Sequence, residues 1–350
     1  MDTIVVTGCS GRIGRAVIHK YRDQNVNIIG FDIVEPSFSQ SRFEFMKVDL
    51  TSDESVNQAF QAIRSKYGST ITSVIHLAAY YNFTGGAWEL YDKLTIKGSE
   101  RLLAAAKKGE CEQFIFSSSM LAQAPCKAVG QRLTEDDPMS TQWEYPKSKT
   151  LAEERLRALH GNTPLVILRI AGCYDDECHS IPISNQIQRI FERDYKARLF
   201  PGNLTHGASF IHIDDVAECI IACVKKRAQL PKETILLVGE EDTMSYDEIQ
   251  REISTCLNGK GIKTYRIPKW VAKIGARVQN SFVKPWMIDL ADQHYAVDIS
   301  RMKKLLAIEP KQSLRKTIPK MIKYLLQDPA RFYKNNRLQH VNPMQWVAAE

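Results

Sequence analysis

The chain has 350 residues, of which 44% are hydrophobic and 25% charged, a composition typical of an enzyme with a sizeable core. No run approaches the roughly 20 apolar residues that a membrane-spanning helix needs, so we expect no membrane partner. The formal net charge of +7 is modest, and the chain lacks the dense basic runs with interleaved aromatics that favour nucleic-acid binding, so we expect no nucleic-acid partner.

The first 170 residues alternate short apolar runs with amphipathic stretches. Several runs are hydrophobic on both faces, which is typical of parallel strands covered by helices on either side. This alternation predicts an α/β fold, a Rossmann-type doubly wound parallel sheet. We expect strands at residues 3–6, 28–32, 45–48, 73–77, 114–117 and 165–170, and helices at 13–22, 54–67, 88–108 and 145–159.

The loop between the first strand and the first helix reads TGCSGRIG over residues 7–14. Gly8 permits a tight turn, Gly11 lets the backbone approach a pyrophosphate, and Gly14 lets the helix pack closely on the sheet. Free N–H groups and the positive end of the helix dipole then face the phosphates of a dinucleotide. The contacts that we predict in this loop are Gly8, Ser10, Gly11, Arg12, Ile13 and Gly14.

Asp32 ends the second predicted strand, about 20 residues beyond the loop, where an acid can accept both hydroxyls of the adenosine ribose. A carboxylate there would repel a 2′-phosphate, and no arginine directly follows Asp32 to bind one. We therefore expect NAD, rather than NADP, as the cofactor.

Tyr145 and Lys149 stand four residues apart in the segment YPKSK, which places a phenol and an ammonium on one helix face. Pro146 is tolerated only in the first turn, so Tyr145 should lie near the helix N-terminus. The ammonium, the helix dipole and a positively charged nicotinamide would each lower the pKa of the phenol. Such a phenol can exchange the proton that accompanies hydride transfer, so we predict that Tyr145 is the general acid/base.

After Gly172 the segments shorten and prolines recur. We predict an NAD-binding domain at residues 1–172, to which 202–238 returns with one more strand at 234–238. Residues 173–201 and 239–310 should form a smaller C-terminal substrate-binding lobe. Residues 311–350 should hold a helix at 313–326 and then a loosely packed tail, because the last twenty or so residues are polar with isolated aromatics.

These motifs together resemble the extended short-chain dehydrogenases/reductases, the NAD-dependent epimerase/dehydratase family. The resemblance covers roughly residues 1–330. It rests also on HLAA at 76–79, the serine run at 117–119, Leu168-Arg169 and FIHIDDVA at 210–217. It implies that Lys149 also holds the nicotinamide ribose and that Ser119 hydrogen-bonds the reacting oxygen.

The resemblance further implies a homodimer through the helices at 88–108 and 145–159. The further cofactor contacts that it implies are Asp49, Leu50, Leu77, Ala78, Ala79, Ser117 and Ile170.

The sequence departs from the family pattern in four respects. Thr95 stands where many members have an Asn that orders a relay water, a task that a hydroxyl can also perform. Met120 and Leu121 follow Ser119 where dehydratases have Asp-Glu, which argues against dehydration. Gly172 and Ala208 replace the Asn and Arg of sugar-nucleotide members, which weakens a nucleotide-sugar assignment. Three other basic residues could substitute for that arginine: Arg189, Arg193 and Lys284.

Other residues invite functional roles that we weigh against structural ones. The run from Cys173 to His179 contains two cysteines, a histidine and carboxylates, but no second ligand cluster accompanies it, so we expect no metal. His76 and His212 are expected to make structural hydrogen bonds. Four aromatic residues after the fourth predicted strand are either pocket walls or loop anchors: Tyr80, Tyr81, Phe83 and Trp88.

The eight cysteines are scattered without a C-x-x-C pair, and the N-terminus has neither a basic leader region nor a cleavage site, which favours the cytoplasm. Three functions stay open. The first is a redox enzyme that interconverts a less polar alcohol and ketone with net turnover of NAD. The second is a nucleotide-sugar epimerase that keeps its NAD, and the third is a non-catalytic NAD sensor. The catalytic residues Ser119, Tyr145 and Lys149 argue against a sensor.

Overall fold

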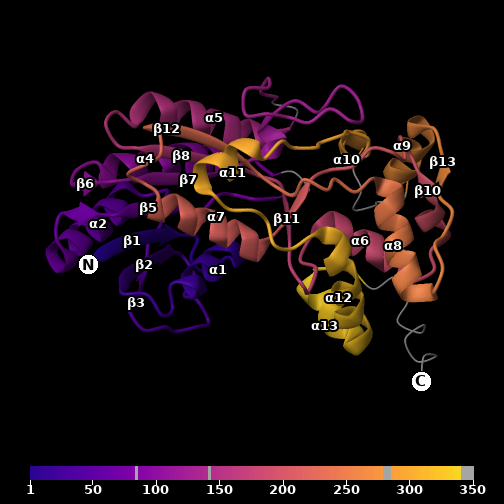
Figure 1. Ribbon diagram of the computed structural model, residues 1–350, viewed down its shortest axis with the longest axis horizontal. Coiled ribbons are helices and arrows are strands. Elements are labelled where there is room, and N and C mark those ends of the chain that lie inside the picture. Colours follow the sequence, from indigo (N-terminus) through magenta and orange to yellow (C-terminus); the bar gives the residue numbers. More distant parts are fainter. Residues whose placement is uncertain (83–85, 141–142, 279–284, 340–350) are drawn as a thin grey trace.

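The computed structural model describes residues 1–82, 86–140, 143–278 and 285–339. In them, seven parallel strands form a central sheet between two layers of helices (Figure 1). The strand order is β12-β8-β7-β5-β1-β2-β3, so the direction of winding reverses between β1 and β5. This confirms the predicted doubly wound α/β fold. The strands are β1 (Asp2–Thr7), β2 (Val26–Asp32), β3 (Phe43–Lys47), β5 (Ser73–His76), β7 (Phe114–Ser119), β8 (Leu165–Ile170) and β12 (Glu233–Val238).

Side chains of the inner strands alternate between the two helix layers. In β1, Ile4 and Val6 pack toward one layer and Val5 toward the other, and all three are buried. One layer consists of α1 (Arg12–Lys20), α7 (Ile213–Lys225) and α11 (Ser300–Leu306). The other consists of α2 (Asp53–Tyr67), α4 (Lys97–Ala106) and α5 (Glu144–Leu159). The double burial of the inner strands explains why several sequence runs were apolar on both faces.

A third core lies beyond the carboxyl edge of the sheet. It unites α6 (Ile181–Phe191), α8 (Tyr246–Asn258), α12 (Leu314–Gln327) and α13 (Pro329–Asn335) around buried residues such as Tyr174. Two short parallel pairs accompany it: β9 (Gly172–Tyr174) with β11 (Phe210–His212), and β10 (Leu199–Phe200) with β13 (Tyr265–Arg266). Helix α9 (Lys269–Val278) lies toward the end of the molecule farthest from the sheet, and α10 (Pro285–Ala291) lies between α9 and the sheet (Figure 1).

Short elements complete the described chain. They are the pair β4 (Thr70–Ile71) and β6 (Glu110–Cys111), and the 3₁₀ turns η2 (Met120–Ala122) and η3 (Tyr195–Arg198). No helix in the described ranges combines the length and the apolar character that crossing a membrane requires.

Two sequence expectations about elements need correction. The helix expected at 88–108 is broken into α3 (Trp88–Leu90), a π-helical segment η1 (Tyr91–Ile96) and α4. The chain after residue 329 is not loosely packed throughout, because α13 buries Phe332 and Tyr333 completely against α12. The isolated aromatics of this polar stretch are therefore part of the hydrophobic core. Residues 340–350 of the expected tail lie outside the described ranges.

Candidate active site

The loop between β1 and α1 depends on glycine at two positions. Gly8 has a φ of +69°, and its N–H donates to the carbonyl of Phe31 in β2 (N···O 2.9 Å). A Cβ on Gly14 would lie 2.3 Å from the carbonyl oxygen of Gly8, so α1 packs directly on the loop. Gly11 is the N-cap of α1 and offers no side chain to cap the helix. The first N–H groups of α1 therefore fit a pyrophosphate.

Asp32 lies beside this loop at the carboxyl end of β2. Its Oδ2 accepts the N–H of Ser10 (3.1 Å), and its Oδ1 accepts the N–H groups of Ile33 (2.8 Å) and Val34 (3.2 Å). The hydroxyl of Ser10 donates to the carbonyl of Val34 (2.5 Å). The structure thus brings Asp32 and the glycine loop together, as the sequence predicts, and fixes the carboxylate with three backbone N–H groups.

His76, at the end of β5, is part of a buried hydrogen-bond chain. Thr7 Oγ1 accepts the N–H groups of Leu77 and Ala78 (both 3.1 Å), so its own proton goes to His76 Nδ1 (2.7 Å). His76 Nε2–H then donates to Ser99 Oγ (2.8 Å). Burial lowers the pKa of His76 to about 3, so the ring stays neutral. These hydrogen bonds hold the segment after β5 against β1, next to Gly8.

The remaining predicted cofactor contacts are dispersed along the same edge. Ala79 is half-buried after β5, and Ile170 ends β8 in the core. Leu50 is buried beneath α2 and α4. Asp49 is exposed, and its Oδ1 accepts the N–H and the hydroxyl of Thr51 (both 2.8 Å). The contacts of these four residues with a cofactor stay a prediction.

Ser119, Tyr145 and Lys149 come from two adjacent elements. Ser119 ends β7, its hydroxyl accepts the N–H of Leu121 (3.2 Å), and its side chain is close enough to Tyr145 to lower the pKa of the phenol in part. Tyr145 is the second residue of α5, with Pro146 in the first turn, as predicted. Lys149 Nζ donates to the carbonyl of Ser117 (2.6 Å) and lies 6.0 Å from the centre of the Tyr145 ring. The hydroxyl of Ser117 donates to the carbonyl of His76 (3.1 Å), so Ser117 fixes the neighbouring strands.

The expected lowering of the Tyr145 pKa by the ammonium, the helix dipole and a nicotinamide together is not found in this structure, where burial dominates. Burial raises the pKa of Tyr145 well above its ordinary value, and the nearby Ser119 side chain offsets only part of this effect. The Lys149 ammonium is directed at the Ser117 carbonyl and lies over the ring of Phe116 (4.9 Å). Burial lowers the pKa of Lys149 itself to about 7. The phenol is therefore protonated at neutral pH.

Aromatic side chains surround Tyr145. Tyr81 meets its ring edge-to-face, with the ring centres 5.0 Å apart, and Trp143 lies 5.6 Å away on the same helix start. Trp286 of α10 stacks on Trp143 at 4.7 Å. The sequence motifs missed both tryptophans, since a contact across 143 positions leaves no local pattern.

The aromatics that the sequence did single out separate into two groups. Among those that the structure describes, Tyr81 is the one with a ring contact to Tyr145. Tyr80 and Trp88 pack on Tyr91 (ring centres 4.7 and 6.4 Å apart), which makes them anchors of the loop. Phe83 lies outside the described residues. The hydroxyl of Thr95, expected to hold a relay water, accepts the N–H of Tyr80 (3.1 Å) and is fully buried in the π-helical segment.

The sugar-nucleotide positions are shaped by packing. A Cβ on Gly172 would lie 2.8 Å from the ring of Phe210, its partner in β11, so a larger side chain there would require that ring to shift. Ala208 is half-buried and bridges to Tyr295. Of the expected substitutes for the missing arginine, Arg189 is half-buried and Arg193 exposed, and Lys284 lies outside the described residues.

The run from Cys173 to His179 forms a tight turn held by ion pairs. Asp175 Oδ2 lies 2.6 Å from His179 Nδ1 and 3.7 Å from Arg12 Nη1 on the glycine loop. In the described ranges, no group of three or more His, Cys, Asp or Glu side chains is arranged to hold a metal ion. His212 accepts the N–H of Asp214 (3.2 Å) at Nδ1 and caps α7, as expected of a structural histidine.

A buried ion pair that the sequence did not predict connects the elements that carry the catalytic residues. Arg169 of β8 binds Glu153 of α5 (Nη2···Oε2 2.8 Å), and both side chains are almost fully buried. Ser118 donates to the same carboxylate, and Arg169 Nη1 donates to the carbonyl of Glu135 (2.8 Å). The pair fixes the middle of α5, the helix that carries Tyr145, against β8 and the end of β7.

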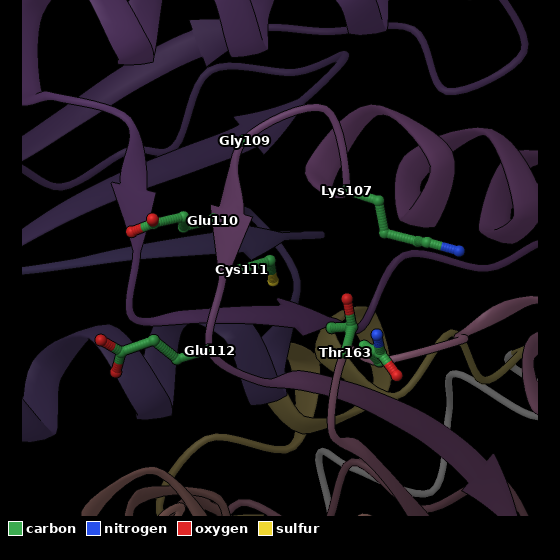
Figure 2. A pocket seen from close by; sticks show the side chains of 7 residues that line it. Lys107, Gly109, Glu110, Cys111, Glu112 and Thr163 are labelled. Carbon is green, nitrogen blue, oxygen red and sulfur yellow. The ribbon is translucent and has the colours of Figure 1, made fainter.

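A separate open depression of about 630 Å³ lies at the opposite, amino edge of the sheet. Figure 2 shows Lys107 and Thr163 on one side of it, and Glu110 and Glu112 on the other. None of the motif residues lines it. Ligands of parallel α/β sheets bind at the carboxyl ends of the strands, so we assign no function to this depression.

Solved structures share this fold. The UDP-glucose 4-epimerase of Thermotoga maritima matches 93% of this chain and 99% of its own, with a TM-score of 0.71 and 19% identity. The UDP-glucuronic acid 4-epimerase of Bacillus cereus, solved with UDP-glucuronic acid and NAD, has the same coverage and TM-score at 20% identity.

Sequence relatives point to the same group. A sterol-4-alpha-carboxylate 3-dehydrogenase of Candida albicans is 28% identical over 195 residues, 50% of this chain and 51% of that protein, so the match spans about half of each. A UDP-glucose 4-epimerase of Vibrio cholerae is 25% identical over 68% of this chain and 70% of its own length. The family model "NAD dependent epimerase/dehydratase family" matches residues 4–239. The chain therefore belongs to the NAD-dependent epimerase/dehydratase family and is an enzyme with NAD as its cofactor.

Proposed function

We propose that this enzyme interconverts a secondary alcohol and a ketone on a substrate of low polarity, with net turnover of NAD. The observation that carries the proposal is the aromatic enclosure of Tyr145 by Tyr81 and Trp143, extended by Trp286. Aromatic faces bind apolar rings well and offer few partners for a sugar's many hydroxyls.

The chemistry at Tyr145 follows from its environment. When bound, the cofactor would supply a hydride as NADH or accept one as NAD⁺. When a ketone is reduced, the Tyr145 hydroxyl gives its proton to the carbonyl oxygen, and the Ser119 hydroxyl hydrogen-bonds that oxygen. Burial keeps Tyr145 protonated at neutral pH, so its side chain is ready to act as the acid. Alcohol oxidation requires the phenol to lose its proton first, and we expect this direction to gain from higher pH.

The positions that would contact a nucleotide diphosphate argue in the same direction. Phe210 packs so closely on Gly172 that an amide side chain there would require its ring to shift, and Ala208 can make no charge-assisted bond to phosphate. The sterol dehydrogenase is the relative whose named substrate is least polar, and its match includes only half of this chain.

A nucleotide-sugar epimerase is the second candidate. Epimerases recur among the relatives and among the solved structures of the same fold. An epimerase would retain NAD through each cycle, so the two candidates differ in whether NADH accumulates.

The test is a substrate panel with NAD: a sterol with a ring hydroxyl, a small secondary alcohol and UDP-glucose, followed by NADH absorbance. We expect NADH to accumulate with the sterol and not with UDP-glucose. Conversion of UDP-glucose to its epimer without NADH formation would instead establish the second candidate.

We also propose that the protein is a cytoplasmic homodimer that pairs through α4 and α5. All eight cysteines are free thiols, which is compatible with a reducing compartment. Light scattering would test the dimer, because a mass of one chain at micromolar concentration would refute it.

A further inference from the structure

Helix α9 exposes an apolar face. Trp270 is 66% exposed, Ile274 53% and Val271 40%, and these three positions share one side of the helix. Helices of globular proteins ordinarily turn such residues toward the core. Here the hydrophobic face points away from the protein.

A different side of α9 carries two partly exposed lysines that pair with acidic side chains of the lobe. Lys269 binds Asp292, and Lys273 Nζ lies 2.8 Å from Oδ2 of Asp289 in α10. These two ion pairs fix the orientation of α9 on the lobe. The exposure of Trp270, Val271 and Ile274 is therefore determined by contacts on that side of the helix.

The chain around this face is strongly basic. Residues 260–288 contain seven lysines and arginines and no acidic residue, and two of the seven, Lys269 and Lys273, are paired with Asp292 and Asp289. Lys263 and Arg266 are exposed at β13, which pairs with β10, and exposed Arg198 directly precedes β10. Figure 1 shows α9, β10 and β13 together at the end of the molecule farthest from the sheet. Tyr265, 51% exposed, lies among these cations.

We propose that this face, made of Trp270, Val271 and Ile274 with Lys263 and Arg266, docks on the surface of an anionic lipid membrane. A helix of ten residues is far too short to span a bilayer. It can lie in the interface, with its apolar side chains among the acyl chains and the cations at the lipid phosphates. The charge complementarity selects an anionic surface. This proposal revises the expectation of no membrane partner.

The same face is connected to the active site. Helix α9 packs on α10, whose Trp286 stacks on Trp143 beside Tyr145. Docking would place this end of the substrate lobe at the bilayer, where an apolar substrate dissolves. This link to substrate delivery rests on the proposed function, whereas membrane binding itself does not.

The test is flotation of the full-length protein with vesicles of phosphatidylcholine, with and without phosphatidylglycerol. We expect binding only to the anionic vesicles, and loss of most of it at high salt. The double variant Trp270→Ser/Ile274→Ser should reduce binding about tenfold, and Lys263→Glu/Arg266→Glu by a similar factor. Leu326→Ser, which alters an exposed leucine on α12, is the matched control and should bind like the wild type.

Absence of binding to anionic vesicles, or undiminished binding by the Trp270→Ser/Ile274→Ser variant, would overturn the proposal. A dimer of the wild type that the same double variant dissociates, as measured by light scattering, would also overturn the proposal. A second copy of the chain would then occupy this face. None of these readouts requires turnover, so their failure leaves the proposed function standing. Failure of the substrate panel likewise leaves vesicle binding to be judged separately.

Discussion

The hydroxyl of Tyr145 lies among aromatic rings and next to Ser119, with its proton retained by burial. Replacement by phenylalanine keeps the ring contacts and removes only the proton donor. We expect Tyr145→Phe to lower turnover about a thousandfold. Affinity for NAD, measured by calorimetry, should change little. The control is Tyr81→Phe, which preserves the edge-to-face ring contact and should stay within a few-fold of the wild type. Equal turnover by Tyr145→Phe and wild type would remove Tyr145 from the chemistry.

Gly14 is the residue at which the cofactor loop tolerates least change. A methyl group there would lie 2.3 Å from the Gly8 carbonyl oxygen, so α1 must move away from the loop. We expect Gly14→Ala to weaken NAD binding by at least tenfold and to destabilise the fold by about 1–3 kcal/mol. Gly261→Ala is the matched control, since its Cβ would make only ordinary contacts at 3.5 Å. Calorimetric titration and thermal unfolding of both variants measure the difference.

At the scale of elements, α5 is attached to the sheet by the buried pair of Arg169 and Glu153. Loss of one partner leaves the other charge buried and unpaired, which typically costs about 3–5 kcal/mol. We expect Arg169→Met to reduce the free energy of unfolding in urea by that amount. Arg157→Met removes a half-exposed pair with Glu233 from the same helix and should cost less than about 1 kcal/mol. If Arg169→Met and Arg157→Met lost similar amounts of unfolding free energy, burial would not make the Arg169–Glu153 pair more important for stability than the exposed pair.

The elements also show where sequence patterns suffice. The strands of the sheet were predictable because parallel strands between two helix layers are apolar on both faces, as Ile4, Val5 and Val6 illustrate. The π-helical segment at Tyr91–Ile96 was not, because its sequence is compatible with an ordinary helix. Helix α13 was missed because Phe332 and Tyr333 alone gave too short an apolar pattern.

Some contacts of the candidate site could likewise be predicted from local sequence, and others could not. The glycine loop and Asp32 follow consecutive elements, and Tyr145 and Lys149 share one helix, so local spacing predicted their proximity. The pairing of Trp143 with Trp286 depends on how α10 folds back over the sheet edge, which local sequence does not encode. The direction of the Tyr145 pKa shift failed for a related reason, since burial is a property of the assembled fold.

At the scale of the whole molecule, Glu240 connects the sheet to the C-terminal helices. It lies just beyond β12, where Tyr174 donates to its Oε1 (2.6 Å) and the N–H of Leu314, at the start of α12, donates to its Oε2 (2.9 Å). Burial raises the pKa of Glu240 to about 7 from its ordinary 4.5. Between these pH values the folded protein holds a proton that the unfolded chain has released.

Stability should therefore fall as pH rises from 4.5 to 7, by up to about 3 kcal/mol from this group. Glu240→Gln keeps both hydrogen bonds by reversing the one to Tyr174, and it should flatten this part of the stability profile. Glu241→Gln changes an exposed neighbour and should leave the profile as in the wild type. Urea unfolding at closely spaced pH values measures the slopes, and an unchanged slope in Glu240→Gln would exclude this group as their source.

The most direct test of hydride transfer with net turnover is to recover the cofactor after reaction. The enzyme is incubated with NAD and a hydroxysterol, filtered to remove protein, and the filtrate is assayed for NADH. We predict NADH in the filtrate in molar excess over enzyme, with an equal amount of ketone, and almost none with Tyr145→Phe. Cofactor that stays with the protein while UDP-glucose is epimerised and the hydroxysterol is untouched would contradict the account.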